Sequence, residues 1–423
     1  MNILLLGSGG RESAIAWKLS QSPLCTKLFI APGNPGTAAY GENLPTAITD
    51  FEKIRQHCLD QHIDILFPGG EDSLVAGIYD FFKSDPLLQH IIVVGPSQNG
   101  AQLEGSKAFS KKFMQRHNIP TAAYQEFNQE NYQEGISYLQ NHSLPVVIKA
   151  DGLAAGKGVI IAYTHEESIQ AFNNMILDHQ FGAAGQVVVI EEFLTGIELS
   201  VFAMSDGKGY VLLPEAKDYK RIGEGDTGPN TGGMGAISPV PFASESFMEE
   251  VRTHIIDPTI SGLAAENITY QGFIFFGLIK VDDRPYVIEY NCRMGDPETE
   301  VVMPRLDEDL VQLILDMNSG TLGQRGCKHS EEAAATLMLV SHGYPGDYEK
   351  GKMIQGLNQV QDSIIFQAGT RLEESTLLSN GGRVIAITSL ASNLKSALHQ
   401  SYQNAIHINF EGKTYRRDIG YEF

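Results

Sequence analysis

Residues 146–158 read Val-Val-Ile-Lys-Ala-Asp-Gly-Leu-Ala-Ala-Gly-Lys-Gly, an apolar strand that carries a lysine and runs into a glycine-rich loop. The stretch is not a Walker A sequence, which needs four residues between its glycines, then Lys and Ser or Thr, and then a helix. Here three residues separate Gly152 from Gly156, Gly158 replaces Ser or Thr, and residues 159–161 predict a strand. We therefore predict a strand–loop–strand hairpin, in which Lys149 reaches a phosphate and the loop N–H groups close over the γ-phosphate.

The first hundred residues alternate apolar strands with helices. The predicted strands are apolar throughout and end at Gly or Pro, which is typical of a parallel sheet covered on both faces. Ligands of such sheets bind at the carboxyl ends of the strands, so the turns there are candidates for a site. The predicted strands are Asn2–Leu6, Lys27–Ile30, Ile63–Phe67 and Ile91–Val94, and the first helix is Arg11–Leu19.

The glycine turn at residues 7–12 is not a dinucleotide fingerprint. Its sixth position holds glutamate instead of glycine, and no acid ends the second strand, which disfavours an NAD-dependent dehydrogenase. Gly9 and Gly10 can still present N–H groups to one phosphate at a helix N-terminus, although a plain chain reversal would use the same glycines. Glu71 and Asp72, at the same sheet edge, can accept hydrogen bonds from sugar hydroxyls or can simply begin a helix.

From residue 120 the pattern becomes α+β in character. After the strand that ends at Glu191, a short linker can pair its backbone with an adenine edge, and Glu198 can accept hydrogen bonds from ribose hydroxyls. A further α/β unit begins near Gly326. The predicted strands are Pro145–Lys149, Val159–Ala162, Gln186–Glu191, Glu198–Met204, Tyr210–Leu213, Gly272–Val281, Pro285–Tyr290, Ala333–Val340 and Arg383–Thr388, and the helices are Lys107–His117, His165–Leu177, Glu245–Glu266 and Leu394–Ile406.

Residues 285–293 alternate along a predicted strand. Glu289, Asn291 and Arg293 share one face, because side chains of a strand repeat every two residues. A carboxylate and an amide oxygen suit Mg²⁺, which takes one or two protein oxygens and completes its shell with phosphate and water. Arg293 can bind a carboxylate or phosphate through two hydrogen bonds. An ordinary strand with a polar outer face would alternate in the same way, but the following Met-Gly-Asp-Pro-Glu at 294–298 disfavours that interpretation.

A basic segment precedes a glycine-rich stretch. Lys217, Lys220 and Arg221 lie within five residues, and an acidic protein that binds anions must concentrate its cations in this way. Residues 223–236 contain six glycines and almost no apolar side chains, so we predict a mobile loop, and loops of this length are usually functional or disordered. A solvated surface loop is the alternative interpretation.

Length and composition narrow the class of protein. The 423 residues predict two to four structural units, and the net charge of −20 disfavours a nucleic-acid partner. There is no apolar run of about 18 residues to span a membrane, and the first residues predict a strand instead of a signal peptide. The four cysteines lie far apart without a Cys-x-x-Cys pair, which favours reduced thiols. We expect a cytoplasmic protein without a nucleic-acid or membrane partner.

The order of these pieces resembles the ATP-grasp superfamily and, within it, the phosphoribosylamine–glycine ligases of purine biosynthesis. The resemblance covers essentially the whole chain. The lysine with its glycine loop marks only the superfamily, whereas residues 226–235 and 293–298 are specific to these ligases. The stretches that carry the resemblance are 7–13, 68–73, 103–107, 149–158, 191–198, 226–235 and 291–298.

The resemblance implies an α/β and α+β multidomain fold. It places an N-terminal Rossmann-like parallel sheet in residues 1–102 and an ATP-grasp core in residues 103–325, with a lid at about 121–192. A small C-terminal α/β domain would occupy residues 326–423. The resemblance also suggests a monomer.

The implied reaction joins glycine to 5-phosphoribosylamine with ATP, through glycyl phosphate. The implied ATP-binding residues are Lys107, Lys149, Gly156, Lys157 and Gly158 at the phosphates, Glu191, Phe193 and Leu194 at the adenine, largely by backbone, and Glu198 at the ribose. Glu289 and Asn291 would bind Mg²⁺ or Mn²⁺. Gly9, Gly10, Glu71, Asp72, Lys220, Gly233, Arg293 and Asp296 would bind the other substrates, and Arg293, Lys149 and Asp218 would be catalytic.

The chain departs from the family pattern at five positions. Lys217 and Tyr219 replace the Gln and His of Gln-Asp-His-Lys-Arg. Met294 and Glu300 replace the Phe and the final Gln of Arg-Phe-Gly-Asp-Pro-Glu-x-Gln. Lys280 stands where many ATP-grasp enzymes have a metal-binding acid. These changes lie among the residues expected around the acceptor substrate and the metal more than among those of the ATP site.

Three other functions are alternatives to the ligation of glycine. Another ATP-grasp ligase or carboxylase would share the lysine and glycine loop but should lack the stretches 226–235 and 293–298. A biotin-dependent carboxylase would need a biotin carrier, and the sequence encodes none. A non-catalytic nucleotide-binding regulator would be expected to have lost Lys149 or Glu289, and both are present.

Overall fold

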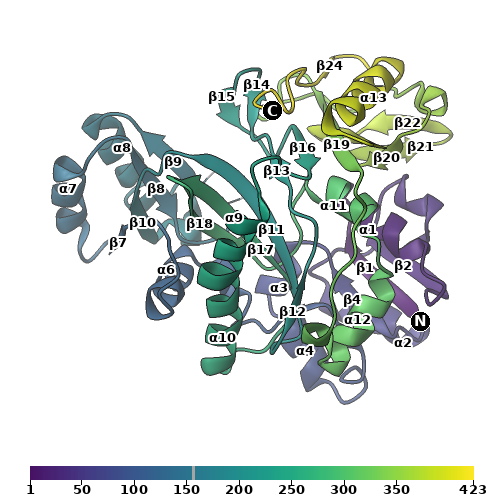
Figure 1. Cartoon of the computed structure of the whole chain (residues 1–423), viewed down its shortest axis with the longest axis horizontal. Helices are drawn as coiled ribbons and strands as arrows, with labels where there is room; N and C mark the ends of the chain where they lie inside the picture. Colours follow the sequence, from purple (N-terminus) through teal and green to yellow (C-terminus); the bar gives the residue numbers. More distant parts are fainter. Residues whose placement is uncertain (155–157) are drawn as a thin grey trace.

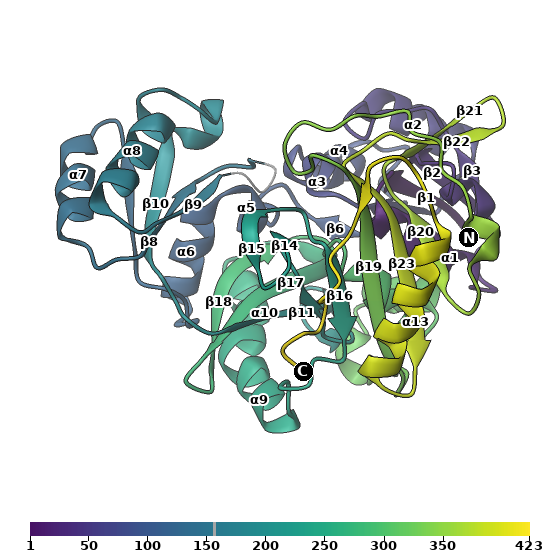
Figure 2. The same ribbon diagram turned by 90° about the horizontal axis from the view of Figure 1, so that it is seen from above.

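The computed structural model describes residues 1–154 and 158–423, and the predicted loop residues 155–157 lie outside them. Four main sheets organise the described chain, and Figure 1 shows one of them in a lobe that stands apart from the rest. Figure 2 shows the same separation from above, with the N-terminal and C-terminal parts packed together on the other side. No described helix has the length and apolar character needed to span a membrane.

The N-terminal sheet has the strand order β3-β2-β1-β4-β5 and is parallel throughout. Leu4 and Leu6 of β1 enter one core cluster, whereas Ile3 and Leu5 enter another, so both faces of this strand are buried. This confirms the predicted parallel sheet. The elements are β1 Asn2–Gly7, α1 Gly10–Ser20, β2 Lys27–Pro32, β3 Glu42–Asn43, α2 Phe51–Asp60, β4 Ile65–Pro68, α3 Glu71–Val75, α4 Ile78–Ser84 and β5 Ile92–Val93.

The separate lobe is a four-stranded antiparallel sheet in the order β7-β10-β8-β9. Val146, Ile148 and Ala150 pack with Phe172 of α8, so the alternation along the strand turns Lys149 to the opposite face, toward α6. The pairing of β8 with β9 confirms the predicted strand–loop–strand hairpin. The elements are α6 Lys107–Arg116, β7 Tyr124–Asn128, α7 Tyr132–Asn141, β8 Val146–Ala150, β9 Val159–Ala162, α8 His165–Ile176 and β10 Val187–Glu192.

The third sheet, β12-β11-β17-β18, is antiparallel and pairs at β17 with the short strand β6. One face packs on the helical segment 245–265 and on residues of the N-terminal sheet, in one continuous core. The elements are β6 Gly95–Pro96, α5 Gln102–Gly105, β11 Ile197–Ser205, β12 Tyr210–Leu212, α9 Glu245–Val251, α10 Asp257–Ala265, β17 Tyr270–Val281 and β18 Arg284–Asn291.

The fourth sheet, β13-β16-β19-β23-β20, combines two early strands with the C-terminal part of the chain. Helix α13 covers it, and β24 pairs with β19. Because β13 and β16 belong to this sheet, residues 217–238 lie against the C-terminal part; the division at residues 102 and 325 stays a prediction. The elements are β13 Lys217–Asp218, β16 Gly235–Ser238, α11 Thr299–Arg305, α12 Leu310–Ser319, β19 Ala333–Ser341, β20 Ile364–Gln367, β21 Thr370–Glu373, β22 Thr376–Ser379, β23 Arg383–Ala391, α13 Leu394–His407 and β24 Lys413–Thr414.

Two predicted elements differ from the structure. The expected single helix at 245–266 contains a π-helical turn at Arg252–Ile256, directly before Pro258, which has no N–H to continue an α-helical ladder. The stretch 223–236, predicted as a loop, contributes β15 Thr227–Asn230, which pairs with β14 Arg221–Gly223, and enters β16. All four residues of β15 are exposed, so the apolar pattern that predicts a strand is absent.

Candidate active site

Lys149 lies in a buried cluster of two lysines and one glutamate. Its ammonium is 2.9 Å from Glu191 Oε2, and Lys111 Nζ on α6 is 3.1 Å from the same oxygen. All three side chains are 6% exposed or less. Burial lowers the pKa of Lys111 to about 8, against the opposing charge of Glu191. Two cations share one carboxylate here, so the cluster has positive charge left for an anion.

The glycine loop is fixed at its start to the N-terminus of α6. Asp151 Oδ1 accepts hydrogen bonds from the N–H of Ala108 at 2.7 Å and from Ser106 Oγ at 2.9 Å. Burial lowers the pKa of Lys107, which lies between these residues, and the charge of Glu289 opposes that effect. Beyond the loop, Gly158 O accepts a hydrogen bond from Ala150 N at 2.8 Å. The predicted Gly156 and Lys157 lie outside the described residues.

Glu289 and Asn291 point to the side of β18 that faces these lysines. A β-bulge leaves Ile288 without a partner residue on β17, between Val287 and Glu289. This extra residue shifts the alternation of side chains between the two faces of β18. Within the described chain, neither the Glu289 carboxylate nor the Asn291 amide has an ion pair or side-chain hydrogen bond. The described residues also hold no cluster of three His, Cys, Asp or Glu side chains suited to a metal. The pair therefore fits Mg²⁺ bound to one or two protein oxygens and to phosphate, but not a closed all-protein site.

A second charged group surrounds Asp218 and Lys220. Lys220 forms an ion pair with Glu198, and its Nζ is 3.8 Å from Asp218 Oδ1. Burial raises the pKa of Asp218, with Lys220 opposing and Glu198 adding to the effect. Burial likewise raises the pKa of Glu298 to about 7, helped by the charge of Asp218. The charge of Glu289 supports the raised pKa of Lys220, which places this group beside the predicted metal ligands.

The segment that follows β10 connects the lobe to the third sheet. Phe193 and Leu194 are half-buried there, between Glu191 and the start of β11. The side chain of Glu191 is occupied by the two lysines, and Glu192 Oε1 accepts a hydrogen bond from Ala123 N at 2.8 Å. Any contact from this linker to an adenine edge would therefore use backbone groups.

Arg293 and Glu71, both predicted to bind substrate, bind each other. Arg293 Nε lies 3.1 Å from Glu71 Oε2, Nη2 lies 2.7 Å from Glu104 Oε1, and Nη1 donates to Met294 O at 3.2 Å. Burial would raise the pKa of Glu71, but Arg293 and Arg11 lower it to about 2. These contacts join α3, α5 and the end of β18. Asp72, the next residue of α3, is exposed.

A cavity of about 460 Å³ opens where the N-terminal sheet edge meets the C-terminal part. Gly9 and Gly10 line it from the turn before α1, and Asp296, Tyr344 and Arg383 line it from the opposite side. The Gly9 N–H already donates to Glu12 Oε2 at 2.6 Å, so the other backbone N–H groups at the start of α1, with an arginine opposite, are the ones that suit a phosphate group.

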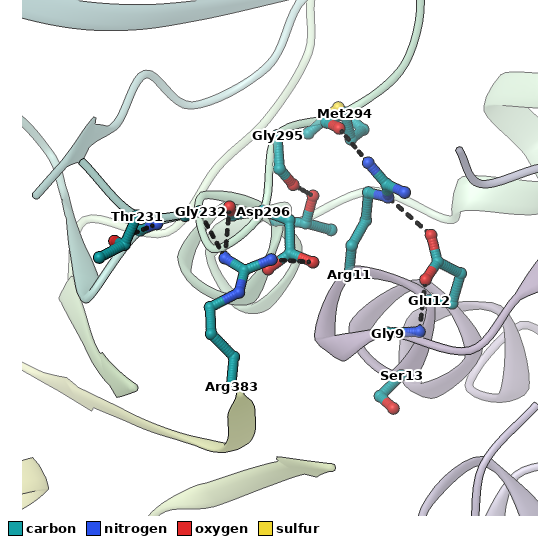
Figure 3. A network of polar contacts seen from close by, with 12 residues as sticks. Gly9, Arg11, Glu12, Ser13, Thr231, Gly232, Met294, Gly295, Asp296 and Arg383 are labelled. Atoms are coloured by element: carbon teal, nitrogen blue, oxygen red, sulfur yellow. Dashed lines mark hydrogen bonds and ion pairs between the residues drawn. The ribbon is translucent and has the colours of Figure 1, made fainter. Parts of the chain in front are cut away.

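Asp296 is held by an arginine from β23. Arg383 Nη2 lies 2.9 Å from Asp296 Oδ2, and Arg383 Nη1 donates to the carbonyl oxygens of Asp296 and Gly232. Figure 3 shows Arg383 reaching toward Asp296 and Gly232, while Arg11 reaches from α1 to Met294. Gly233 has φ +114°, and a Cβ there would lie 2.3 Å from Pro297 Cδ. Glycine is required at that position because a side chain would collide with the segment that carries Asp296.

Glu300 is a buried carboxyl group under this network. It is fully buried, neither oxygen has a hydrogen-bond partner in the described chain, and its Oε1 would lie 2.4 Å from a Cβ at Gly10. Burial raises its pKa well above the ordinary 4.5, and the charge of Asp296 adds to the effect. The folded protein therefore binds a proton here that the unfolded chain has lost by pH 7. Stability must fall as the pH rises above the ordinary carboxyl range.

We expect Glu300→Gln to stabilise the protein at pH 8 by about 1–3 kcal/mol, because the amide keeps the shape and needs no proton. The gain should shrink toward zero below about pH 4.5, where the unfolded glutamate is also protonated. Urea unfolding at several pH values measures the difference, with the exposed Glu331→Gln as the matched control. A stabilisation that does not change between pH 4 and pH 8 would contradict a buried neutral carboxyl.

The structure adds site residues that sequence patterns do not reveal. Lys111, Glu104, Glu298 and Arg383 each contact or face a predicted residue from a distant part of the chain. The sequence spacing could have identified Lys111, because it lies four residues after Lys107 and therefore on the same helix face. The other contacts depend on packing between units.

Three family models match consecutive parts of the chain. They describe the N domain of phosphoribosylglycinamide synthetase at residues 1–104, its ATP-grasp (A) domain at 105–299 and its C domain at 334–422. The chain belongs to the phosphoribosylglycinamide synthetase family. The phosphoribosylamine–glycine ligase of Pasteurella multocida is 45% identical over 425 residues, covering 100% of this chain and 98% of that protein. The enzyme of the same name from Yersinia pestis is 45% identical over 427 residues, with the same coverage.

Solved structures agree with the family. The crystal structure of phosphoribosylamine–glycine ligase from Thermotoga maritima matches with a TM-score of 0.85 and 36% identity, covering 99% of this chain and 100% of that one. The biotin carboxylase domain of the Hydrogenobacter thermophilus 2-oxoglutarate carboxylase matches with a TM-score of 0.72 at 15% identity, covering 98% of this chain and 91% of that one. The second likeness supports the fold alone. Together they confirm a multidomain fold with an ATP-grasp core.

Proposed function

We propose that this chain ligates glycine to 5-phosphoribosylamine in de novo purine biosynthesis, converting ATP to ADP and phosphate through a glycyl phosphate intermediate. The observation that carries the proposal is the full-length match, at 45% identity, to proteins named phosphoribosylamine–glycine ligase. The arrangement of the residues is consistent with it. Residues 289–298 run from the side chains near the lysine cluster to the cavity at the glycine turn, so one segment connects a nucleotide site with a sugar-phosphate site.

In the proposed mechanism, Lys149 and Lys107 bind the ATP phosphates, with Lys111 holding Glu191 and so orienting Lys149. Backbone groups of residues 191–194 bind the adenine, and Glu198 binds the ribose. The glycine carboxylate attacks the γ-phosphorus and displaces ADP. The amine of phosphoribosylamine then attacks the acyl carbon of glycyl phosphate, releases phosphate and loses a proton. Such chemistry depends mainly on positioning and on neutralising the charge of the phosphoryl group.

Glu289 and Asn291 would hold Mg²⁺ or Mn²⁺, as the chemistry of their free oxygens suggests. When bound, the ion supplies charge neutralisation at the β- and γ-phosphates. Lys220 and Asp218 lie beside this position and are assigned to the acceptor side. We assign Arg293 to positioning, because its guanidinium already engages Glu71, Glu104 and Met294.

Gly9 and Gly10 would bind the phosphate of phosphoribosylamine in the 460 Å³ cavity, and Asp296 and Gly233 would shape its other wall. We further propose that the protein acts as a monomer in the cytoplasm. The resemblance to the phosphoribosylamine–glycine ligases supports the monomer; sedimentation of the purified protein tests it.

The proposed reaction predicts that ADP release requires both glycine and phosphoribosylamine. Phosphoribosylamine is generated in situ from ribose 5-phosphate and ammonia, and ADP is followed by a coupled assay with Mg²⁺-ATP. Omitting either co-substrate should reduce release to the background of the protein with ATP alone. Release that ignores phosphoribosylamine, or that needs a different carboxylic acid, would overturn the substrate assignment while leaving the ATP-grasp fold intact.

A further inference from the structure

The segment 416–422 contacts the basic segment that carries Asp218 and Lys220. Arg416 is fully buried and forms ion pairs with Asp226 at 2.5 Å and Asp418 at 2.8 Å. Tyr421 donates its hydroxyl to the other oxygen of Asp226 at 3.0 Å. These contacts bring the segment against the turn between β14 and β15, where Figure 1 also places the chain end.

Glu422 binds the residues on both sides of Asp218. Its Oε1 lies 3.1 Å from Lys217 Nζ, and its Oε2 accepts a hydrogen bond from the Tyr219 hydroxyl at 2.9 Å. Lys217 Nζ also lies 4.4 Å from the centre of the Tyr219 ring. Lys217 is 7% exposed and Tyr219 is 1% exposed, so the three side chains form a nearly closed cluster.

The geometry of a strand separates this cluster from the site. Side chains alternate between the two faces, so Lys217 and Tyr219 point to one face of the segment, and Asp218 and Lys220 point to the other. Glu422 therefore fixes the back of the segment whose front carries two proposed acceptor residues. Glu422 is also the only ion-pair partner of Lys217 in the described chain.

Lys217 and Tyr219 are two of the positions at which this sequence departs from the family pattern, and both contact the same carboxylate. A buried ammonium requires a counterion, and a buried phenol requires a hydrogen-bond partner. Glu422 supplies both. Without it, Lys217 and Tyr219 would lose the carboxylate that fixes them, and the segment that carries Asp218 and Lys220 would lose its support from behind.

We propose that Glu422 is a positioning residue for the ligation reaction, which acts through Lys217 and Tyr219 to hold Asp218 and Lys220 in their working orientation. The inference rests on the proposed function for the identity of the acceptor substrates. It predicts a larger effect on the acceptor side of the reaction than on ATP. The segment contacts Glu198 at the proposed ribose position through Lys220, but the phosphate-binding lysines lie on other elements.

A double-mutant cycle tests this role. Glu422→Gln should lower kcat/KM for glycine about tenfold at saturating ATP, while the KM for ATP changes less than about twofold. In a chain that already carries Lys217→Met and Tyr219→Phe, which have no donor for the Glu422 carboxylate, Glu422→Gln should lower kcat/KM less than about twofold. The exposed Glu411→Gln, on the same part of the chain, is the matched control and should match the wild type.

Equal losses in both backgrounds, or an equal loss of ATP affinity, would overturn the positioning role. If Glu422→Gln fails to fold in thermal unfolding, Tyr219→Phe replaces it in the test. That variant removes one hydroxyl, keeps the Lys217 ion pair and should lower kcat/KM about threefold. A wild-type chain that releases ADP only with another acid would count against the proposed function alone, and the cycle is then measured with that acid.

Discussion

Lys149→Ala is expected to lower kcat for ADP release by about a hundredfold to a thousandfold, the usual effect of removing one preorganised charge from a developing transition state. Lys149 is the next-to-last residue of the buried strand β8, and its ammonium lies 2.9 Å from Glu191, on the side of the sheet that faces Glu289 and Lys107. Alanine removes this charge without filling its place. Lys111 remains 3.1 Å from Glu191, so the carboxylate keeps a counterion and the variant should fold.

Steady-state ADP release measures this effect, and thermal unfolding checks the fold. The matched control is Lys112→Ala on α6, because Lys112 is 55% exposed and, among the described residues, pairs only with Glu126; this change should leave kcat within about twofold. A Lys149→Ala protein that keeps near wild-type turnover would remove Lys149 from the proposed phosphate site.

Local patterns in the sequence were sufficient for most of the fold. The parallel sheet at residues 1–94 follows from strands that are apolar throughout, and the hairpin after Lys149 follows from an apolar run on each side of a glycine loop. Both signals are local, since they depend on side-chain periodicity and on the backbone freedom of glycine. The strand in residues 227–230 gives no such signal, because Thr-Gly-Pro-Asn contains no apolar side chain.

The contacts between site residues, unlike the strands and the hairpin, cannot be predicted from local sequence patterns. Glu71 and Arg293 are 222 residues apart, and Arg383 reaches Asp296 across 87 residues. No periodicity can reveal that two predicted substrate-binding residues satisfy each other's charge. The same limit applies to Glu300 and Glu422, whose surroundings exist only after four sheets have packed together. Residue types and their spacing therefore predict which side chains could carry chemistry, whereas the contacts show which of them already have a charged partner.

Glu289 is a charged site residue that has no charged partner among the described residues. It is half-buried, lacks a partner in the described chain, and its charge acts on Lys107, Lys220 and Arg293 at once. Those cations come from α6, from the segment after β13 and from the end of β18. The carboxylate thus lies where the proposed nucleotide, acceptor and sugar-phosphate regions meet, which is the position required of a group that holds a cation between substrates.

Glu289→Ala should therefore separate binding from turnover. We expect kcat with Mg²⁺ to fall by about a hundredfold or more, because a ligand that neutralises the phosphoryl group is lost. Binding of ATP without metal should be retained or strengthened, because an anion no longer repels the phosphates from Lys107 and Lys149. Calorimetric titration with ATP in EDTA, beside ADP release over a range of Mg²⁺ concentrations, measures both effects.

Asp283→Asn, an exposed acid at the turn of the same hairpin, is the control that should change neither. Loss of metal-free ATP binding together with turnover would mean that Glu289 only maintains the fold of β18, since a purely structural defect cannot spare one and abolish the other.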